Sequence, residues 1–441
     1  MAIHPYRDQN NLLTSVPLPE LLLLQQRFVR LRVEDVAAEV AAIVERQDVV
    51  EKMRPGARIA IAVGSRGIAN IALIVQTLVA ALKRQGAEPF IVPAMGSHGG
   101  ATPEGQHEVL TSLGVTQEYI GAPIVSSLDV DQLGELPNGL PVYIDRAAHQ
   151  ADGIIVINRI KPHTDFSAPI ESGLAKMVAI GLGKHQGALT LHSWGLNGLT
   201  VQIPEAAQFT VQHAAILFGL AVIENAYDEV AEIVLVPPSG IGTEIERDLT
   251  ERAKAFMPRL PWDQLDVLVI DEMGKNISGA GMDPNIIGRM RWGEQKATAA
   301  DITCIAILDL TDASHGNAIG MGLADFTTRK FLEKVDSEAA YINSLTAGVI
   351  ALNSAKLPLV LEDERTAVAA AIRSSGRPDL KQIQLARIQN TLKLEYILAS
   401  PAALNSIRTG SDIEVIGNIG EFKVEPDNTL TSFEHIVRHH A

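Results

Sequence analysis

The chain has 441 residues, of which 46% are hydrophobic and 20% are charged, a composition typical of a folded protein with two or three domains. Its formal net charge of −15 argues against nucleic acid or an anionic membrane as a partner, because both are bound through clustered Lys and Arg. A small anionic ligand remains compatible with this charge if a few basic side chains converge locally.

Cysteine usage and hydropathy indicate the compartment. The single cysteine, Cys304, cannot form a disulfide within the chain, so we expect a reducing, cytoplasmic environment. Its apolar surroundings over 302–310 predict a buried strand residue rather than a catalytic thiol. The first residues lack the pattern of a signal peptide, and no window approaches the roughly 20 apolar residues of a membrane-spanning helix.

The first half of the chain alternates between helical and strand-like patterns, with glycine-containing loops after the strands. The predicted elements are a helix over 34–53, a strand over 58–63, a helix over 70–85, a strand over 89–94, a helix beginning near 102–104 and a strand over 153–158. Repeated strand, glycine loop and helix predict a mostly parallel sheet with helices on its faces. In such sheets, ligands bind beyond the carboxyl ends of the strands.

The second half predicts another α/β unit after a boundary at Pro258 and Pro261. Before this boundary the sequence predicts a strand over 232–236 and a helix over 244–256. After it the sequence predicts strands over 266–271 and 302–310 and helices near 324–335 and 338–353. We therefore expect an α/β protein with an N-terminal domain over 1–260 and a smaller C-terminal α/β domain over 261–395. We expect the tail over 396–441 to return to the N-terminal domain.

The densest group of chemically capable residues lies between 158 and 192. It contains Asn158-Arg-Ile-Lys-Pro-His163, Glu171-Ser-Gly-Leu-Ala-Lys176, Gly181-Leu-Gly-Lys-His-Gln-Gly187 and His192. Taken singly, a loop His or a solvated Lys is more often structural than functional. Because so many polar residues crowd together after a buried strand, with glycines between them, the segment favours a site.

These segments resemble lactate racemase and its homologues, which use a nickel-pincer nucleotide. The resemblance rests on His163, on Ser172-Gly173 before Lys176, and on His192 sixteen residues after Lys176. It also rests on a Gly-Ser-His turn ending at His98 and on Gly64-Ser65-Arg66 after the first strand. The similarity covers most of 55–200 and, more weakly, 265–295.

The resemblance implies an enzyme, a racemase or epimerase of a small anionic 2-hydroxy carboxylic acid. Hydride would move to the cofactor and return to the opposite face, while His98 and His163 act as acid and base, since imidazole titrates near neutrality. Lys176 resembles the lysine that holds the cofactor through a thioamide. His192 resembles the imidazole that completes the nickel coordination.

The resemblance also implies supporting contacts. Arg66 would clamp the substrate carboxylate through its guanidinium, and Lys275 would face the substrate or cofactor from the second domain. The nucleotide phosphate needs a cradle, for which Gly99, Gly100 and Lys184 are candidates, although such glycines can equally be simple turns.

Several positions depart from the family pattern. Val63 stands where the family has an Asp, Gly67 replaces a Pro, and Ser-Gly-Leu-Ala rather than Gly-Gly-Arg precedes Lys176. These departures leave open a 2-hydroxy acid other than lactate as the substrate.

Two alternative functions use the same histidines: a non-catalytic protein that binds a metal or a phosphorylated ligand, and a zinc-type hydrolase with Asp165 or Glu171 as base. Without the nucleotide, the site is expected to be empty or to hold bare nickel or zinc. The oligomeric state is left open.

Overall fold

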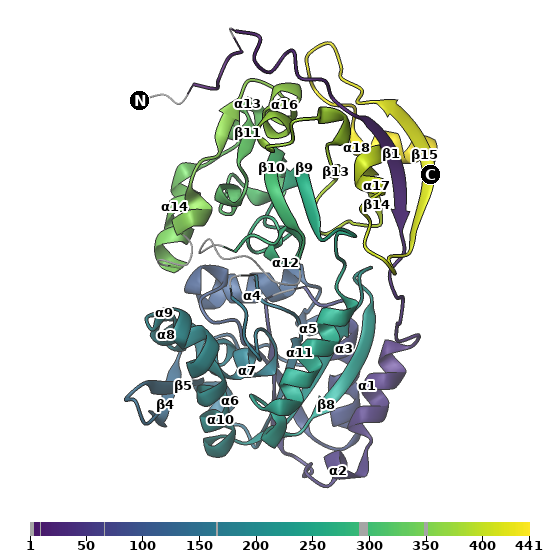
Figure 1. Cartoon of the computed structure of the whole chain (residues 1–441). Helices are drawn as coiled ribbons and strands as arrows, with labels where there is room; N and C mark the ends of the chain where they lie inside the picture. Colours follow the sequence, from purple (N-terminus) through teal and green to yellow (C-terminus); the bar gives the residue numbers. More distant parts are fainter. Residues whose placement is uncertain (1–3, 9, 66, 165, 291–298, 348–351) are drawn as a thin grey trace. The chain divides into compact units, whose positions relative to one another are not determined.

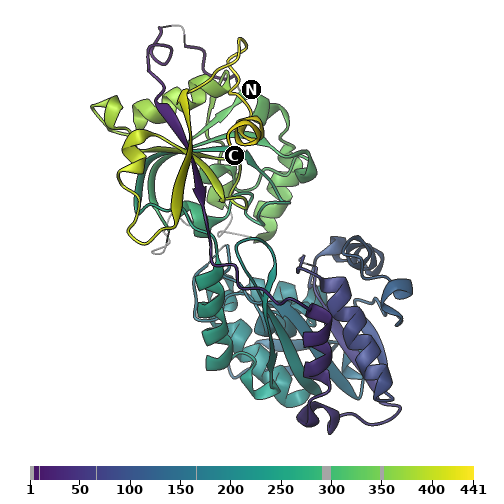
Figure 2. The same cartoon turned by 90° about the vertical axis from the view of Figure 1, so that its right-hand side faces the viewer.

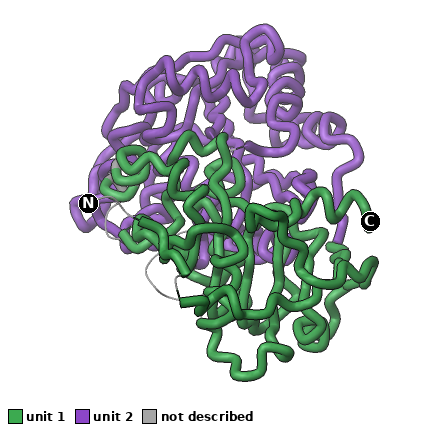
Figure 3. Tube along the Cα trace, turned by 90° about the horizontal axis from the view of Figure 1, so that it is seen from above, with its two compact units in different colours: residues 1–28, 258–441 green, residues 29–257 purple. Residues whose placement is uncertain are grey.

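The computed structural model describes residues 4–8, 10–65, 67–164, 166–290, 299–347 and 352–441. The chain forms two units, one of residues 29–257 and one of residues 1–28 together with 258–441 (Figure 3). Both are α/β, as the sequence predicts. Every helix within the described ranges is too short or too polar to span a lipid bilayer.

The unit of residues 29–257 is built on a five-stranded sheet in the order β3-β2-β6-β7-β8. Its edge strand β8 is labelled in Figure 1. The first four strands are parallel, and β8 is antiparallel to β7. The strands are β2 (Arg58–Val63), β3 (Glu88–Pro93), β6 (Gly153–Arg159), β7 (Ile216–Glu224) and β8 (Val230–Val236), with a separate hairpin of β4 (Val130–Glu135) and β5 (Pro141–Asp145).

Helices cover both faces of this sheet. Those of the first part are α1 (Val36–Val44), α2 (Gln47–Val50), α3 (Ile71–Arg84), η1 (Gly99–Ala101), α4 (Pro103–Ser112), α5 (Gln117–Ile120) and α6 (Arg146–His149). Those of the second part are α7 (Leu174–Lys176), η2 (Met177–Gly181), α8 (Lys184–His192), α9 (Gly195–Asn197), η3 (Gly198–Gln202), α10 (Ile203–His213), η4 (Pro238–Gly240) and α11 (Glu244–Phe256). The central strands are apolar throughout because both of their faces are buried.

The core explains why the sequence predicts this unit well. Alternate residues of β2, such as Ile59 and Ile61, pack with Val40 of α1 and Ile74 of α3. The predicted strand over 58–63 is confirmed, and the predicted helix over 34–53 is two helices, α1 and α2. Thr102 caps α4 by accepting the Gly105 N–H at 3.0 Å, as its position before a Pro predicts.

The second unit contains an eight-stranded sheet in the order β12-β11-β10-β9-β13-β14-β1-β15. Its strands are β1 (Glu20–Gln26), β9 (Gln264–Met273), β10 (Asp301–Leu310), β11 (Phe326–Thr328), β12 (Leu359–Leu361), β13 (Leu385–Ile388), β14 (Tyr396–Ala399) and β15 (Ile413–Glu421). Its helices are α12 (Pro284–Ile287), η5 (Asp312–Ser314), η6 (Met321–Leu323), α13 (Arg329–Glu333), α14 (Ser337–Ala347), η7 (Asn353–Ala355), α16 (Glu364–Ser374), η8 (Leu380–Gln382), α17 (Pro401–Leu404) and α18 (Phe433–His440).

The two ends of the chain do not lie where the sequence-based division puts them. The tail over 396–441 supplies β14 and β15 to the eight-stranded sheet and does not return to residues 29–257. The N-terminal strand β1 lies between β14 and β15, antiparallel to both (Figure 2). Leu21, Leu23 and Leu24 are buried there, which accounts for their apolar run. This sheet has more strands than the five-stranded one.

Cys304 lies in β10 with 5% of its surface exposed, which confirms the prediction of a buried strand residue. Burial raises the pKa of its thiol to about 11. Because the thiolate is the reactive form, this environment is typical of an inert structural cysteine.

Candidate active site

Of three neighbouring parallel strands in the unit of residues 29–257, β2 and β3 end at the same level and β6 runs two residues further. Val63, the last residue of β2, is paired with Pro93 of β3 on one side and with Ile157 of β6 on the other. The loops that follow these strands therefore start side by side at the carboxyl edge of the sheet, where α/β proteins bind ligands. They carry Ser65, His98 and His163, so this edge is the candidate active site.

His98 lies in the loop after β3 and is held by a residue in the loop after the neighbouring strand β2. Its ring Nδ1 shares a hydrogen bond with the Ser65 Oγ, which follows β2. The His98 backbone N–H donates to the Met95 carbonyl at 3.1 Å. Because Ser65 engages Nδ1, Nε2 is the ring nitrogen at which His98 would exchange a proton with a ligand.

His163 and Lys176 lie together in the same unit. The Lys176 Nζ is 2.7 Å from the His163 Nε2, with the ammonium as donor when it is charged. The His163 ring stacks on Phe166, with ring centroids 4.3 Å apart and planes inclined by 22°. The structure thus brings these two predicted residues into direct contact.

Glu171 shapes the loop that carries His163. It is 2% exposed, and its carboxylate accepts the His163 backbone N–H at 2.7 Å and the Ala168 N–H at 3.3 Å. Lys254 of α11 lies 3.2 Å from the same carboxylate. The carboxylate is thus bonded to the backbone of its own loop, which argues against Glu171 as the base of a hydrolase.

Glycines let the helix that carries Lys176 lie across the strand ends. A Cβ at Gly64, just after β2, would come 2.7 Å from the Met177 Cε. A Cβ at Gly181, at the end of η2, would come 2.7 Å from the Ala94 carbonyl oxygen. η2 therefore packs directly on the residues that follow β2 and β3, and Lys176 immediately precedes η2.

Glu246 of α11 binds the start of this helix. Its buried carboxylate accepts the Ala175 N–H at 3.0 and 3.1 Å and the Gly242 N–H at 2.9 Å. These are backbone donors of the kind that the first turn of a helix leaves without an intrahelical partner. Burial raises the pKa of the Glu246 carboxyl, while the hydrogen bonds from the backbone act in the opposite direction.

Glu246→Gln tests this burial. Below the ordinary pKa of 4.5 the wild-type carboxyl is neutral in the folded and unfolded states. As the pH rises through its raised folded pKa, the wild type must ionise a buried group and loses stability, whereas Gln does not. The free energy of unfolding of the variant minus that of the wild type should therefore increase from pH 4 to pH 8. Urea unfolding measures this difference, with the exposed Glu244→Gln on the same helix as control. A difference that stays flat or falls with pH contradicts the assignment.

His192, the candidate metal ligand, is the last residue of α8 in the same unit. Its Nδ1 donates to the Ala188 carbonyl at 2.6 Å. A neutral imidazole that donates from Nδ1 carries its lone pair on Nε2, which is the arrangement of many metal-ligating histidines.

The structure assigns Lys184 a role other than the expected phosphate contact. Lys184 is completely buried, and its Nζ lies 3.2 Å from the Asp145 carboxylate, 2.6 Å from the Pro93 carbonyl oxygen and 3.1 Å from the Gln106 Oε1. Three partners use the three donors of an ammonium. Lys184 is therefore a core residue, not a phosphate ligand.

The two candidate glycines differ in their surroundings. A Cβ at Gly99, where φ is +67°, would come 2.6 Å from the Gln106 N and 2.7 Å from the Gly105 carbonyl oxygen. Packing against α4 therefore explains Gly99 without a ligand. At Gly100, where φ is +64°, a Cβ would meet no atom within 4 Å, and a role in binding stays a prediction.

Ala substitutions should separate these two glycines. Gly99→Ala combines a left-handed backbone with a collision against rigid backbone, and we expect a loss of about 3 kcal/mol in the free energy of unfolding. Gly100→Ala has only the backbone cost, and we expect about 1 kcal/mol. Chemical denaturation of both variants measures the losses, and equal losses would contradict the packing of Gly99 on α4.

Two predicted residues lie outside the described residues, and one lies in the other unit. Arg66, the expected carboxylate clamp, and Asp165, a candidate base, are among the residues that are not described. Lys275 follows β9 in the unit of 258–441, where its Nζ donates to the Gly279 carbonyl at 2.7 Å.

Among the residues that the structure describes, no three His, Cys, Asp or Glu side chains converge on a point that could hold a metal ion. His98, His163 and His192 all belong to that set.

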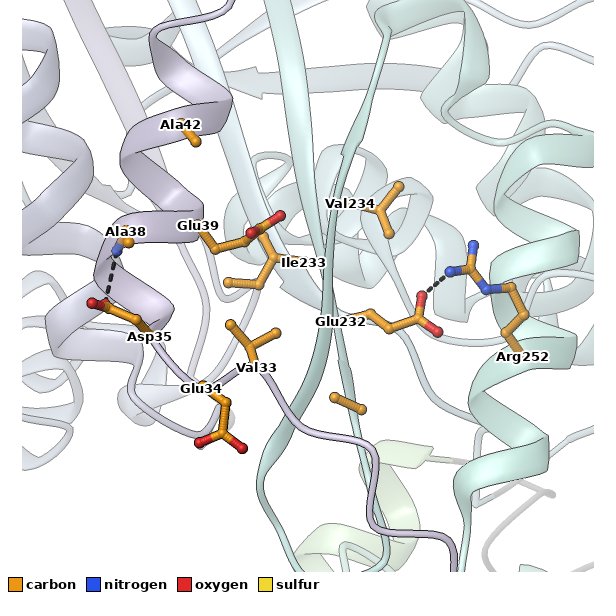
Figure 4. Close-up of a pocket in the computed structure, with 11 residues that line it drawn as sticks. Val33, Glu34, Asp35, Ala38, Glu39, Ala42, Glu232, Ile233, Val234 and Arg252 are labelled. Atoms are coloured by element: carbon orange, nitrogen blue, oxygen red, sulfur yellow. Dashed lines mark hydrogen bonds and ion pairs between the residues drawn. The ribbon is translucent and has the colours of Figure 1, made fainter.

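A groove on the same unit lies away from this edge. It runs along β8, between α1 and Arg252 of α11, which is ion-paired with Glu232 (Figure 4). Glu34 and Glu39 add negative charge to its lining. β8 is the edge strand at the opposite side of the sheet from β3, so this groove is separate from the strand end that carries His98.

Some residues that shape the site were missed by sequence reasoning. Gln106, Asp145 and Glu246 act through contacts with residues 10 to 78 positions away in the sequence. No local sequence pattern predicts such a contact. The signal that was present is the placement of polar residues on otherwise apolar faces, such as Glu246 three positions before Leu249 on α11.

This unit is thus an α/β domain with one imidazole in the loop after β3, one in the loop after β6, and the Lys176 amine in contact with the second. Residues 20–198 match the family model of the lactate racemase N-terminal domain, so this part of the chain is similar to that domain. Comparison with curated proteins gives no match.

Two solved structures are similar over most of the chain. One is a protein from Thermotoga maritima, at 14% identity and a TM-score of 0.48, with 73% of this chain and 82% of that one covered. The other is the lactate racemase apoprotein from Thermoanaerobacterium thermosaccharolyticum, at 13% identity and a TM-score of 0.45, with 82% of each chain covered.

Proposed function

We propose that this chain is a racemase or epimerase of a small 2-hydroxy carboxylic acid that works with a nickel-pincer nucleotide. The family match over 20–198 supports the reaction class. The observation that carries the proposal is the contact of the Lys176 Nζ with the His163 Nε2 at 2.7 Å, just before η2, which packs on the residues that follow β2 and β3.

The residues present fit the cofactor. Lys176 supplies a primary amine at the site, as a thioamide link requires. The His192 tautomer places a lone pair on Nε2, and imidazole together with sulfur donors suits nickel. When bound, the nucleotide supplies a carbon that takes hydride from the substrate and returns it. The protein supplies position, proton transfer and electrostatics.

His98 and His163 would carry the hydroxyl proton of the substrate. One imidazole takes the proton as the 2-hydroxyl group becomes a carbonyl, and the other gives a proton when hydride returns to the opposite face. For the reverse direction the two roles exchange. Ser65 holds the His98 Nδ1, which directs this transfer to Nε2.

The substrate carboxylate needs a cation. Arg66 is our candidate, because a guanidinium binds a carboxylate through two parallel hydrogen bonds. Lys275 is a second candidate for contact with the substrate or cofactor. Val63 and Gly67 differ from the lactate racemase pattern beside Arg66, so a test of function should include longer hydroxy acids and sugar acids.

The test uses protein produced together with the enzymes that build the cofactor. Native mass spectrometry with metal analysis should show one nickel per chain and a mass increment on the peptide that contains Lys176. A panel of single enantiomers is then incubated in D2O and analysed by chiral chromatography and mass spectrometry.

We expect one 2-hydroxy acid to interconvert while it keeps protium at the α-carbon, because hydride returns without exchange with solvent. Deuterium at that carbon would refute the hydride route. Loaded protein that interconverts no member of the panel would refute the racemase.

A further inference from the structure

The candidate acid/base His98 lies at the end of a buried polar network that the proposed chemistry does not use. Gln106 of α4 is completely buried, and its Nε2 donates to the Gly96 carbonyl at 2.9 Å and to the His98 carbonyl at 3.3 Å. Both carbonyls belong to the loop that follows β3. A single side chain thus binds this loop on either side of Ser97.

Lys184 decides which way the Gln106 amide points. An ammonium can only donate, so the Gln106 oxygen must face the Lys184 Nζ, at 3.1 Å. The amide nitrogen is thereby turned toward the loop, and both of its N–H groups reach carbonyl oxygens. Without Lys184, the amide could rotate and offer its oxygen to carbonyls that need a donor.

Lys184 is itself fixed from several elements. Asp145, at the end of β5, pairs with its Nζ and also accepts the Ala148 N–H at 2.8 Å. The Asp145 N–H donates to the Leu182 carbonyl at 2.6 Å, and the Lys184 Nζ donates to the Pro93 carbonyl at the end of β3. Burial lowers the pKa of Lys184 and raises that of Asp145, and their attraction opposes both shifts.

The backbone of Lys184 adopts a strained conformation. Its φ is +54°, a conformation that a residue with a side chain seldom adopts and that the surrounding structure must hold in place. This left-handed residue is the first of α8, with two residues between it and η2, so it separates the two helical segments. It brings the side chain to the core side, toward Asp145 and Gln106.

We propose that Gln106 and Lys184 are positioning residues that fix His98 for proton transfer. Because both His98 and its acid/base role enter through the proposed function, this inference rests on that function. The network acts on the loop backbone, while Ser65 orients the ring. Together they hold the imidazole from its peptide unit and from Nδ1.

Gln106→Met tests the proposal with little change in side-chain length. It removes the two donors to the loop and leaves Lys184 with Asp145 and the Pro93 carbonyl. Gln106→Glu is the second variant, because it keeps an oxygen for Lys184 and removes the donors. The matched control is Gln85→Met, which deletes a side-chain hydrogen bond to the Val44 carbonyl at the far end of α3.

The first measurement needs no cofactor. In the full chain labelled at histidine, the His98 ring resonances are assigned by their loss in His98→Gln. We expect Gln106→Met and Gln106→Glu to shift and broaden the His98 resonances and to leave the His192 resonances as in the wild type. The histidine spectrum of Gln85→Met should match that of the wild type. Unchanged His98 resonances overturn the proposal. Failure of both Gln106 variants to fold also overturns it, because Gln106 would then serve stability alone.

The second measurement uses loaded enzyme. Misplacement of a catalytic group by about 1 Å costs roughly 100-fold in rate, so we expect kcat to fall by roughly 10- to 100-fold with KM within about threefold of the wild type. A rise in KM alone would overturn the assignment. If the wild-type protein proves inactive on every substrate, the proposed function fails, and the resonance measurement still decides whether Gln106 positions His98.

Discussion

His98→Gln and His163→Gln should each lower the rate of interconversion by at least about 100-fold from either enantiomer, because general acid–base catalysis contributes roughly 10²- to 10⁴-fold. Each imidazole acts as base in one direction and as acid in the other, so neither direction is spared. Gln keeps a polar side chain of similar length and cannot exchange a proton near neutral pH. Chiral chromatography from both pure enantiomers measures the two rates.

The same variants should keep their cofactor, since neither histidine is proposed to hold it. Nickel content and the mass of the peptide with Lys176 are therefore expected to match the wild type. His107→Gln, on the exposed side of α4, is the matched control and should retain full rate. A variant of His98 or His163 with near-normal turnover would remove that residue from the mechanism.

Lys176→Ala should lose the covalent adduct and with it all interconversion above background. The Nζ is the atom that would form the thioamide, and no other amine is proposed at that position. Lys176→Arg is the more informative variant, because it retains a cation that can donate to His163. We expect it also to carry no adduct, which peptide mass spectrometry and metal analysis of the purified protein would show.

The control for this experiment is Lys83→Arg, on α3, whose Nζ bonds the Gly121 carbonyl. It should load and turn over as the wild type does. An adduct that survives Lys176→Ala would place the link elsewhere. Full activity of Lys176→Arg without an adduct would show that this chain works without a covalent cofactor.

Local sequence patterns were sufficient to predict many helices and strands of the unit of residues 29–257. β2 and α11 occupy the predicted ranges 58–63 and 244–256. β2 is buried on both faces and therefore reads as a continuous apolar run, while α11 shows an apolar stripe through Leu249 and Ala253. Such signals lie within one element, so the sequence carries them without knowledge of the partners.

Elements that depend on distant partners were harder to predict. The helix expected over 324–335 is observed as α13 (Arg329–Glu333), and the three residues before it form β11 (Phe326–Thr328), because pairing with β10 and β12 overrides their local preference. The predicted helix over 338–353 is observed as α14 up to Ala347, and 348–351 lie outside the described residues.

By itself the sequence determined the α/β class, the alternation of strands and glycine loops, and the spacing that relates His98, His163, Lys176 and His192 to the lactate racemase family. Only the tertiary structure decided that the first strand and the tail share one sheet. It also decided that Lys184 is a buried partner of Asp145 and that Lys176 contacts His163. The reason is physical: periodicity and spacing are properties of a segment, whereas strand pairing and ion pairing depend on contacts between segments far apart in the chain.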